Sequence, residues 1–125
     1  MTKTTGHILV VDDDPDIGLM IKAILEFNGY SVVVTERPEK VKALVSSDSF
    51  NLLIMDMLLS GMNGIDICAG LKKDASISPL AIIMISAHPN AKEICHEAVA
   101  DDFVSKPFDI EAMLSKVKRL VHTYS

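Results

Sequence analysis

The 125-residue sequence contains two cysteines and no tryptophan, and it lacks any long apolar run. Cys68 and Cys95 form no Cys-x-x-Cys pair, and no histidine stands at zinc-finger spacing from them, which argues against a zinc module or a disulfide framework. No stretch approaches the roughly 20 apolar residues that a membrane-spanning helix needs. The short apolar run after Gly6 ends in acids, unlike a signal peptide. We therefore expect a cytoplasmic protein without membrane contact.

Basic residues are also scarce, because 12 Lys and Arg stand against 17 Asp and Glu, a formal net charge of −5. Proteins that bind nucleic acid directly need clustered Lys and Arg to neutralise phosphates. We therefore expect no direct contact with nucleic acid. Apolar residues make up 49% of the chain, which is enough for a packed core rather than a disordered segment. A chain of this length accommodates one domain.

Short β-branched runs alternate with amphipathic segments along the chain. The predicted strands are residues 8–11, 32–34, 52–55, 81–85 and 103–104, and the predicted helices begin near Pro15, Pro38, Gly64, Pro89 and Asp109. We expect Asp14 to cap the first helix and Asn28-Gly29 to end it. Strict alternation of strand and helix predicts an α/β fold, with a single doubly wound sheet of five parallel strands.

Four predicted strands end in small polar or charged side chains. These are Asp12 with Asp13, Asp56, Ser86 and Lys106. Because the carboxyl ends of parallel strands meet at one edge of a sheet, where such folds bind ligands, we expect these side chains to converge. Asp12 and Asp13 repel each other unless a cation or a proton intervenes. Mg²⁺, a hard cation with oxygen ligands, resolves that conflict and would balance the charge of about −2 left by three carboxylates and one ammonium.

Each of these residues also has a purely structural interpretation. Asp14 is most simply a helix cap. Asp56, in contrast, ends the most apolar strand, where a carboxylate loses hydration without improving packing, so we interpret it as functional. Ser86 alone would be a turn residue, and Lys106 alone would be a solvated lysine. Pro107 favours an extended Lys106, which allows its ammonium to point toward the edge of the sheet.

Four motifs taken together resemble the receiver domain of two-component response regulators. They are Ile8–Pro15 with its three acids, Met55-Asp56 followed by Met62-Asn63-Gly64, Ser86-Ala87, and Asp101–Phe108 with Lys106-Pro107. The resemblance covers about residues 7–122 and implies one receiver domain over residues 1–125 without an output domain. It also implies a flavodoxin-like fold with strand order 2-1-3-4-5.

The resemblance implies that Asp56 accepts a phosphoryl group from a sensor histidine kinase or a histidine phosphotransfer protein. Asp12 and Asp13 would organise Mg²⁺, or Mn²⁺ in its place, together with Asp56 and the main-chain carbonyl of Leu58. Lys106 would neutralise phosphoryl oxygens, since phosphoryl transfer depends on in-line placement and on neutralisation of charge.

The resemblance further implies a conformational switch. Ser86 would donate a hydrogen bond to the phosphoryl group and move toward it, and Phe103 would change rotamer. Leu58 and His88 would flank the mouth of the site and influence how long the phosphoryl group survives, although His88 is equally well read as a turn residue. Phe103 stands where the family often has Tyr, which excludes a phenolic hydrogen bond.

The implied protein is a signalling domain rather than an enzyme, limited to its own phosphorylation and dephosphorylation. It would act on a downstream protein or a fused output domain, as a monomer or as a phosphorylation-dependent dimer. The alternative is a small phosphatase of the haloacid-dehalogenase kind that uses Asp12 and Asp14, but Pro15 departs from its motif and Asp56 would have no role. Dinucleotide and flavin carriers are disfavoured because acids stand at the phosphate position and no Gly-x-Gly-x-x-Gly follows the first strand.

Overall fold

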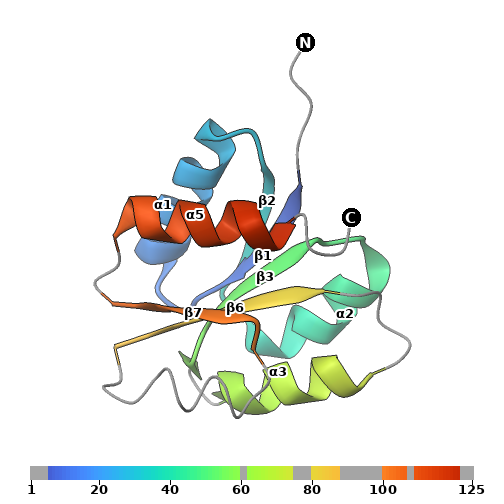
Figure 1. The fold of residues 1–125 in the computed structure, drawn as a ribbon. Helices are drawn as coiled ribbons and strands as arrows, with labels where there is room; N and C mark the ends of the chain where they lie inside the picture. The colour runs from blue at the N-terminus through green and yellow to red at the C-terminus, as the bar shows by residue number, and fades with distance from the viewer. Residues whose placement is uncertain (1–5, 60–61, 75–79, 88–99, 107–108, 122–125) are drawn as a thin grey trace.

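The computed structural model describes residues 6–59, 62–74, 80–87, 100–106 and 109–121 (Figure 1). The elements in chain order are β1 (His7–Val11), α1 (Pro15–Phe27), β2 (Ser31–Thr35), the 3-10 helix η1 (Pro38–Lys40), α2 (Val41–Ser47), β3 (Leu52–Asp56), β4 (Leu58–Leu59), β5 (Met62–Asn63), α3 (Gly64–Lys73), β6 (Ala81–Ser86), β7 (Asp102–Ser105) and α5 (Ile110–Val121). The helix expected after Pro89 lies outside the described residues.

The main sheet has five parallel strands in the order β2-β1-β3-β6-β7. Since β6 and β7 are its fourth and fifth strands along the chain, the predicted order 2-1-3-4-5 is confirmed. The observed strands are longer at their ends than predicted, as β3 extends to Asp56 and β6 extends to Ser86. Because all five strands are parallel, the carboxyl ends of β1, β3, β6 and β7 share one edge of the sheet.

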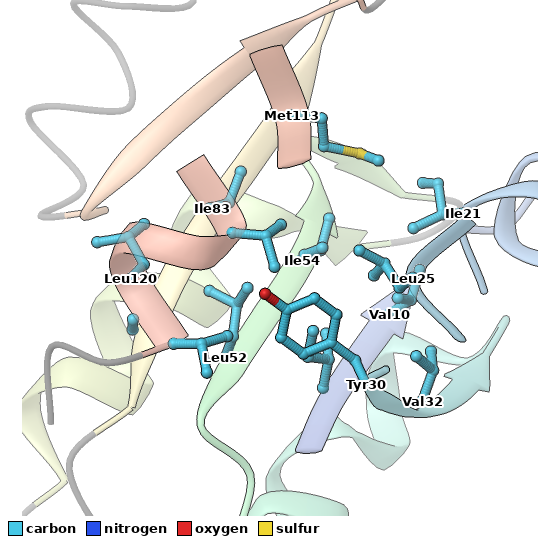
Figure 2. Packing of buried hydrophobic residues seen from close by; sticks show 14 of the residues in the cluster. Val10, Ile21, Leu25, Tyr30, Val32, Leu52, Ile54, Ile83, Met113 and Leu120 are labelled. Carbon is cyan, nitrogen blue, oxygen red and sulfur yellow. The ribbon is translucent and has the colours of Figure 1, made fainter. Parts of the chain in front are cut away.

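Helices cover both faces of this sheet (Figure 1). Side chains of β1 alternate between the two faces, as in any strand. Ile8 and Val10 pack with residues of α1 and α5, whereas Leu9 and Val11 pack with residues of α2 and α3. Figure 2 shows the first of these two cores, where Ile21 and Leu25 of α1 and Met113 and Leu120 of α5 surround the central strands. The three central strands, β1, β3 and β6, are consequently buried on both faces and largely apolar.

The boundaries of α1 follow the local signals in the sequence. The Asp14 side chain accepts a hydrogen bond from the main-chain amide of Asp16 at 2.9 Å, and Pro15 occupies the first turn. Gly29 follows the helix with φ of 93°, a left-handed conformation that favours glycine. Asp109 caps α5 in the same way, accepting from the amide of Glu111 at 2.9 Å.

Two local features differ from the sequence-based expectation. The second helix begins as a single 3-10 turn at Pro38 and becomes α-helical only at Val41. A short antiparallel pair, β4 with β5, lies between β3 and α3 and was not predicted. The predicted start of α3 at Gly64 is confirmed, and the Asn63 side chain caps it by accepting from the amide of Ile65 at 2.8 Å. Within the described residues, no helix is long and apolar enough to cross a bilayer.

Candidate functional site

The polar strand ends meet at one edge of the main sheet because the strands are in matching register. Val11 is paired with Met55, so the residues that follow β1 lie beside the end of β3. Asp56 is paired with Ile85, and Ser86 is paired with Ser105, one residue before Lys106. Side chains from the start, the middle and the end of the sequence therefore share one location.

Three carboxylates form a tight cluster at this edge. Asp12, Asp13 and Asp56 each place one carboxylate oxygen so that the three oxygens lie within 4.8 Å of one another. Asp12 is 1% exposed and Asp56 is 8% exposed, whereas Asp13 is partly exposed. Like charges at this separation in a low-dielectric site repel strongly. Such a cluster is suited to a cation.

Lys106 supplies one positive charge to the cluster. Its Nζ donates a hydrogen bond to Asp56 Oδ2 at 2.6 Å and lies 3.7 Å from Asp12 Oδ2. The Lys106 main-chain amide donates to the Ser86 carbonyl at 2.9 Å, which holds the residue at the end of β6. Burial by itself would lower the pKa of Lys106, but the Asp56 hydrogen bond and the two nearby carboxylates outweigh burial and raise that pKa. The ammonium consequently stays charged at neutral pH.

Asp12 is the most constrained of the three acids. Its Oδ1 accepts a hydrogen bond from the main-chain amide of Asp14 at 2.9 Å, while its buried Oδ2 receives no hydrogen bond from the described residues. The contact from Lys106 to Oδ2 is too long for a hydrogen bond. Burial raises the pKa of Asp12, and the charges of Asp56 and Asp13 raise it further, against the lowering effects of the Asp14 amide and Lys106.

The donor set fits a hard divalent cation. The three neighbouring carboxylate oxygens are the ligand type that Mg²⁺ prefers. Asp12 Oδ2, which accepts no hydrogen bond from the part of the chain that the structure describes, is a buried acceptor that a cation would satisfy. Softer metals are disfavoured, because no thiolate or imidazole belongs to the cluster among the residues described.

Gly64 lies closer to the site than the sequence alone indicates. A Cβ atom on Gly64 would lie 2.4 Å from the main-chain oxygen of Asp56 and 3.0 Å from that of Met57. The Gly64 amide donates to the Met57 carbonyl at 2.9 Å, so the start of α3 packs directly on the chain that carries Asp56. The Asn63-Gly64 pair in the sequence signals a helix start, but the close approach to Asp56 becomes visible only in three dimensions.

The remaining predicted site residues differ in how the structure places them. Ser86 is buried at the end of β6, and its carbonyl contacts Lys106. Phe103 in β7 is partly buried against the core under α2 and α3, with Lys116 Nζ 5.0 Å from its ring centroid. Leu58 begins β4, two residues after Asp56. His88 lies outside the described residues.

Most of the sequence matches the model of a known protein family. The family model described as the response regulator receiver domain matches residues 8–118. The DNA-binding response regulator MtrA of Mycolicibacterium smegmatis is 33% identical over 114 residues, which are 90% of this chain and 49% of that protein. The chain spans about half the length of the curated relatives it matches.

Solved structures agree with the sequence comparison. The receiver domain of a signal transduction histidine kinase from Syntrophus aciditrophicus is 30% identical, with a TM-score of 0.84 over 93% of this chain and 89% of that one. The chemotaxis response regulator CheY4 of Vibrio cholerae shares the fold at 23% identity, with a TM-score of 0.83 over 95% and 99% of the two chains. The phosphatase alternative gains no support from these matches, and the Asp14 that it requires caps α1.

Proposed function

This chain belongs to the family of response regulator receiver domains, and we propose that it is a switch controlled by phosphorylation of Asp56. The observation that carries the proposal is the 2.6 Å contact between Lys106 Nζ and Asp56 Oδ2 beside the Asp12 and Asp13 carboxylates. A reactive carboxylate, an ammonium and a cation-binding acidic pair are the parts that phosphoryl transfer requires. The proposed domain comprises residues 1–125, with residues of about 7–122 as its core.

The metal would be held by residues that already converge. Receiver domains generally bind Mg²⁺, and here Asp12, Asp13 and Asp56, whose carboxylate oxygens lie close together, would supply three ligands. The main-chain carbonyl of Leu58, two residues after Asp56, would be the fourth protein ligand. When bound, Mg²⁺, or Mn²⁺ in its place, neutralises negative charge on the phosphoryl oxygens and on the carboxylates. The proposed ligand oxygens are hard donors, in keeping with either ion.

The transfer itself is a displacement at phosphorus. An oxygen of the Asp56 carboxylate forms a bond to the phosphorus of a phosphohistidine, while the bond from phosphorus to the imidazole nitrogen breaks and its electron pair stays on that nitrogen. The imidazole then takes a proton from solvent. Lys106, which contacts Asp56 Oδ2 before transfer, donates to a phosphoryl oxygen afterwards and offsets the added charge. The donor is a sensor histidine kinase or a histidine phosphotransfer protein.

The phosphoryl group would then change the shape of the neighbouring surface. Ser86 donates a hydrogen bond to it from the end of β6, and Phe103 in β7 moves as space opens beside the strand. Leu58 and His88 influence how fast water reaches the phosphoryl group. The output is a change in binding to a downstream protein or to a fused output domain, in the cytoplasm.

A direct test is phosphorylation by acetyl phosphate with Mg²⁺, read by intact-protein mass spectrometry. The wild-type chain should gain about 80 Da as an acyl phosphate that survives acid and is lost in base. Asp56→Asn should gain nothing. Asp48→Asn is the matched control, because Asp48 is an exposed aspartate held by His7 on another part of the surface, and it should behave as the wild type.

Two further measurements decide between switch and enzyme. Beryllium fluoride with Mg²⁺ should shift amide resonances around Asp56 and Ser86 in the wild type and leave Asp56→Asn unchanged. Multiple turnover of a phosphate ester that survives Asp56→Asn but is abolished by Asp12→Asn would instead identify a phosphatase and overturn the proposal.

A further inference from the structure

Three polar side chains are joined in a row at the amino edge of the main sheet, opposite the edge that carries Asp56. His7 Nδ1 lies 3.0 Å from Ser31 Oγ, and His7 Nε2 lies 2.9 Å from Asp48 Oδ2. His7 begins β1, Ser31 begins β2 and Asp48 directly follows α2. A hydroxyl, an imidazole and a carboxylate in this order are the parts of a serine nucleophile with its base and the acid that orients the base.

The strand pairing explains why these side chains meet. His7 and Ser31 are partners in the parallel register of β1 and β2, so their side chains stand beside each other on one face of the sheet. Asn51 holds the main chain of His7, because its side chain accepts from the His7 amide at 2.7 Å and its amide donates to the His7 carbonyl at 2.8 Å. The Ser31 amide donates to the Gly6 carbonyl at 2.9 Å. The backbone is thus fixed on both strands.

The contact with Asp48 determines which nitrogen of His7 carries the proton. An ionised carboxylate only accepts hydrogen bonds, so Nε2 donates to Asp48. Asp48 is ionised at neutral pH, since the hydrogen bond from His7 and that from the Ser49 amide lower its pKa. In the neutral imidazole, Nδ1 then carries no proton and accepts the hydrogen bond from the Ser31 hydroxyl. Nδ1 is consequently the atom that can take the proton of Ser31.

Packing holds the imidazole in this orientation. The His7 ring stacks on the ring of buried Phe50, with centroids 4.3 Å apart and 6° between the planes. Groups whose rotamers are fixed by packing and hydrogen bonds are preorganised to act together. Ser31 is partly exposed, so a small reagent can reach it from solvent.

We propose that Ser31 is an activated nucleophile that takes the acyl group of small activated esters. Its Oγ forms a bond to the carbonyl carbon, and its proton passes to His7 Nδ1. The bond from that carbon to the leaving oxygen then breaks, its electron pair stays on the leaving oxygen, and His7 returns the proton to that oxygen. Asp48 offsets the positive charge on the imidazole between these steps. The products are an acyl-serine and an alcohol or phenol.

The surrounding amides limit the expected rate. The main-chain amides of His7, Ser31 and Asn51 already donate to other atoms, so these three do not stabilise the developing oxyanion. Water takes that role at the partly exposed serine. We therefore expect an acceleration of about 100-fold over an ordinary surface serine, the lower end for general base catalysis. The reaction does not use Asp56 and stands independently of the proposed phosphorylation.

Reaction of the full chain with p-nitrophenyl acetate tests this inference. The wild type should release a burst of about one equivalent of p-nitrophenolate, and peptide mass spectrometry should locate a gain of about 42 Da on Ser31. Ser31→Ala should lose the burst and keep only the slow background reaction of surface amines. Ser46→Ala, which changes an exposed serine of α2, is the matched control and should react as the wild type does.

Two further variants separate the base from the residue that positions it. His7→Phe keeps a ring that can stack on Phe50 but removes the base, so it should lower the rate about 100-fold. Asp48→Asn should lower the rate at least about tenfold. The ¹⁵N resonances of the His7 imidazole should then change from the Nε2–H tautomer to a mixture of tautomers, which a merely structural contact would not cause. Circular dichroism verifies the folding of each variant.

Several results would overturn the inference. An acetyl group found only on lysines would do so directly, as would a Ser31→Ala chain that reacts as fast as the wild type. A folded His7→Phe chain with the wild-type rate would show that the imidazole is not the base. An Nδ1–H tautomer in the wild type would also contradict the inference, because that nitrogen could not accept the proton of Ser31.

Discussion

Asp12 is a buried carboxylate that the surrounding fold only half satisfies. One oxygen accepts the Asp14 amide, while the other has no hydrogen bond from the described residues. Burial and the neighbouring acids raise its pKa, so the folded protein holds a proton on Asp12 more tightly than the unfolded chain does. Ionised Asp12 therefore lowers stability at neutral pH, and this loss develops as the pH rises from 3.8 through the raised pKa.

We accordingly expect Asp12→Asn to stabilise the metal-free protein at pH 7 by about 1 kcal/mol while removing Mg²⁺ binding. The amide oxygen of Asn still accepts the Asp14 hydrogen bond, and the buried charge is gone. Urea unfolding at pH 7 and near pH 3 measures the effect, which should vanish at the lower pH. Asp14→Asn is the control, because Asn caps helices as well as Asp does. A destabilised Asp12→Asn at pH 7 would show that its charge is already compensated.

Lys106 is the counter-charge of the acidic cluster. Its removal should lower the stability of the metal-free protein without weakening the binding of Mg²⁺. Lys106→Met should destabilise the metal-free protein by about 2 kcal/mol, because it leaves the Asp56 hydrogen bond unmade. Its affinity for Mg²⁺ should be retained or increased, since a competing cation is gone. Chemical unfolding and metal titration give both values. Lys42→Met, which removes a largely exposed ion pair with Asp74, should cost less than about 0.5 kcal/mol.

The sign of the pH dependence follows from the raised pKa of Lys106. The stabilisation that the charged Lys106 side chain contributes is fully present below pH 10.5. It is lost as the pH rises through the raised pKa of the folded protein. The stability difference between the wild type and Lys106→Met should therefore shrink at strongly alkaline pH. A difference that stays constant there would mean that packing of the Lys106 stem, not its charge, stabilises the site.

At the scale of elements, α3 is set against the site through Gly64. Alanine is the better helix former by up to about 1 kcal/mol, but a Cβ atom here meets main-chain oxygens at 2.4 and 3.0 Å, which cannot move as a flexible side chain would. The steric clash should outweigh the gain in helix propensity. Gly64→Ala should therefore destabilise the protein by about 2 kcal/mol or more and slow the phosphorylation of Asp56.

Gly70, in the same helix, provides the matched control for that variant. A Cβ placed on Gly70 would have no atom of the described residues within 4 Å, apart from its chain neighbours and the backbone of its own helix. Gly70→Ala should therefore stabilise the protein by about 0.5 to 1 kcal/mol and leave phosphorylation unchanged. Thermal unfolding and the rate of acetyl phosphate labelling test both variants. Equal effects of the two substitutions on labelling would contradict the role assigned to the close contact at Gly64.

Elements with strong local signals could be predicted from sequence. Asp14 and Pro15 define the start of α1, and apolar runs define the five strands of the main sheet, whose ends then bring Asp56 and Lys106 together. The β4–β5 pair could not be predicted, since two-residue strands have too few positions to show alternation. The buried Oδ2 of Asp12, which receives no hydrogen bond among the residues described, and the close approach of Gly64 depend on atomic positions, which no residue pattern specifies.

At the scale of the whole molecule, cation binding and folding should be coupled. A ligand that binds only the folded chain stabilises it by RT ln(1 + [L]/Kd), so Mg²⁺ at ten times its dissociation constant should contribute about 1.4 kcal/mol. Thermal unfolding with MgCl₂ should show this increase, and excess EDTA should abolish it. Potassium chloride at matched ionic strength separates binding from screening. An equal increase in Asp13→Asn would indicate that the cation binds away from the acidic cluster.

The order in which the site residues occur along the chain has a consequence for protein synthesis. A ribosome releases the N-terminal part first, so β1 and β3 can deliver Asp12, Asp13 and Asp56 before β7 exists. Lys106 follows β7, which joins the sheet only through β6. A growing chain therefore carries the acids without their ammonium partner and depends on ions of the surrounding solution to balance them. The acidic cluster gains its ammonium partner when residues 102–106 have left the ribosome and docked on β6.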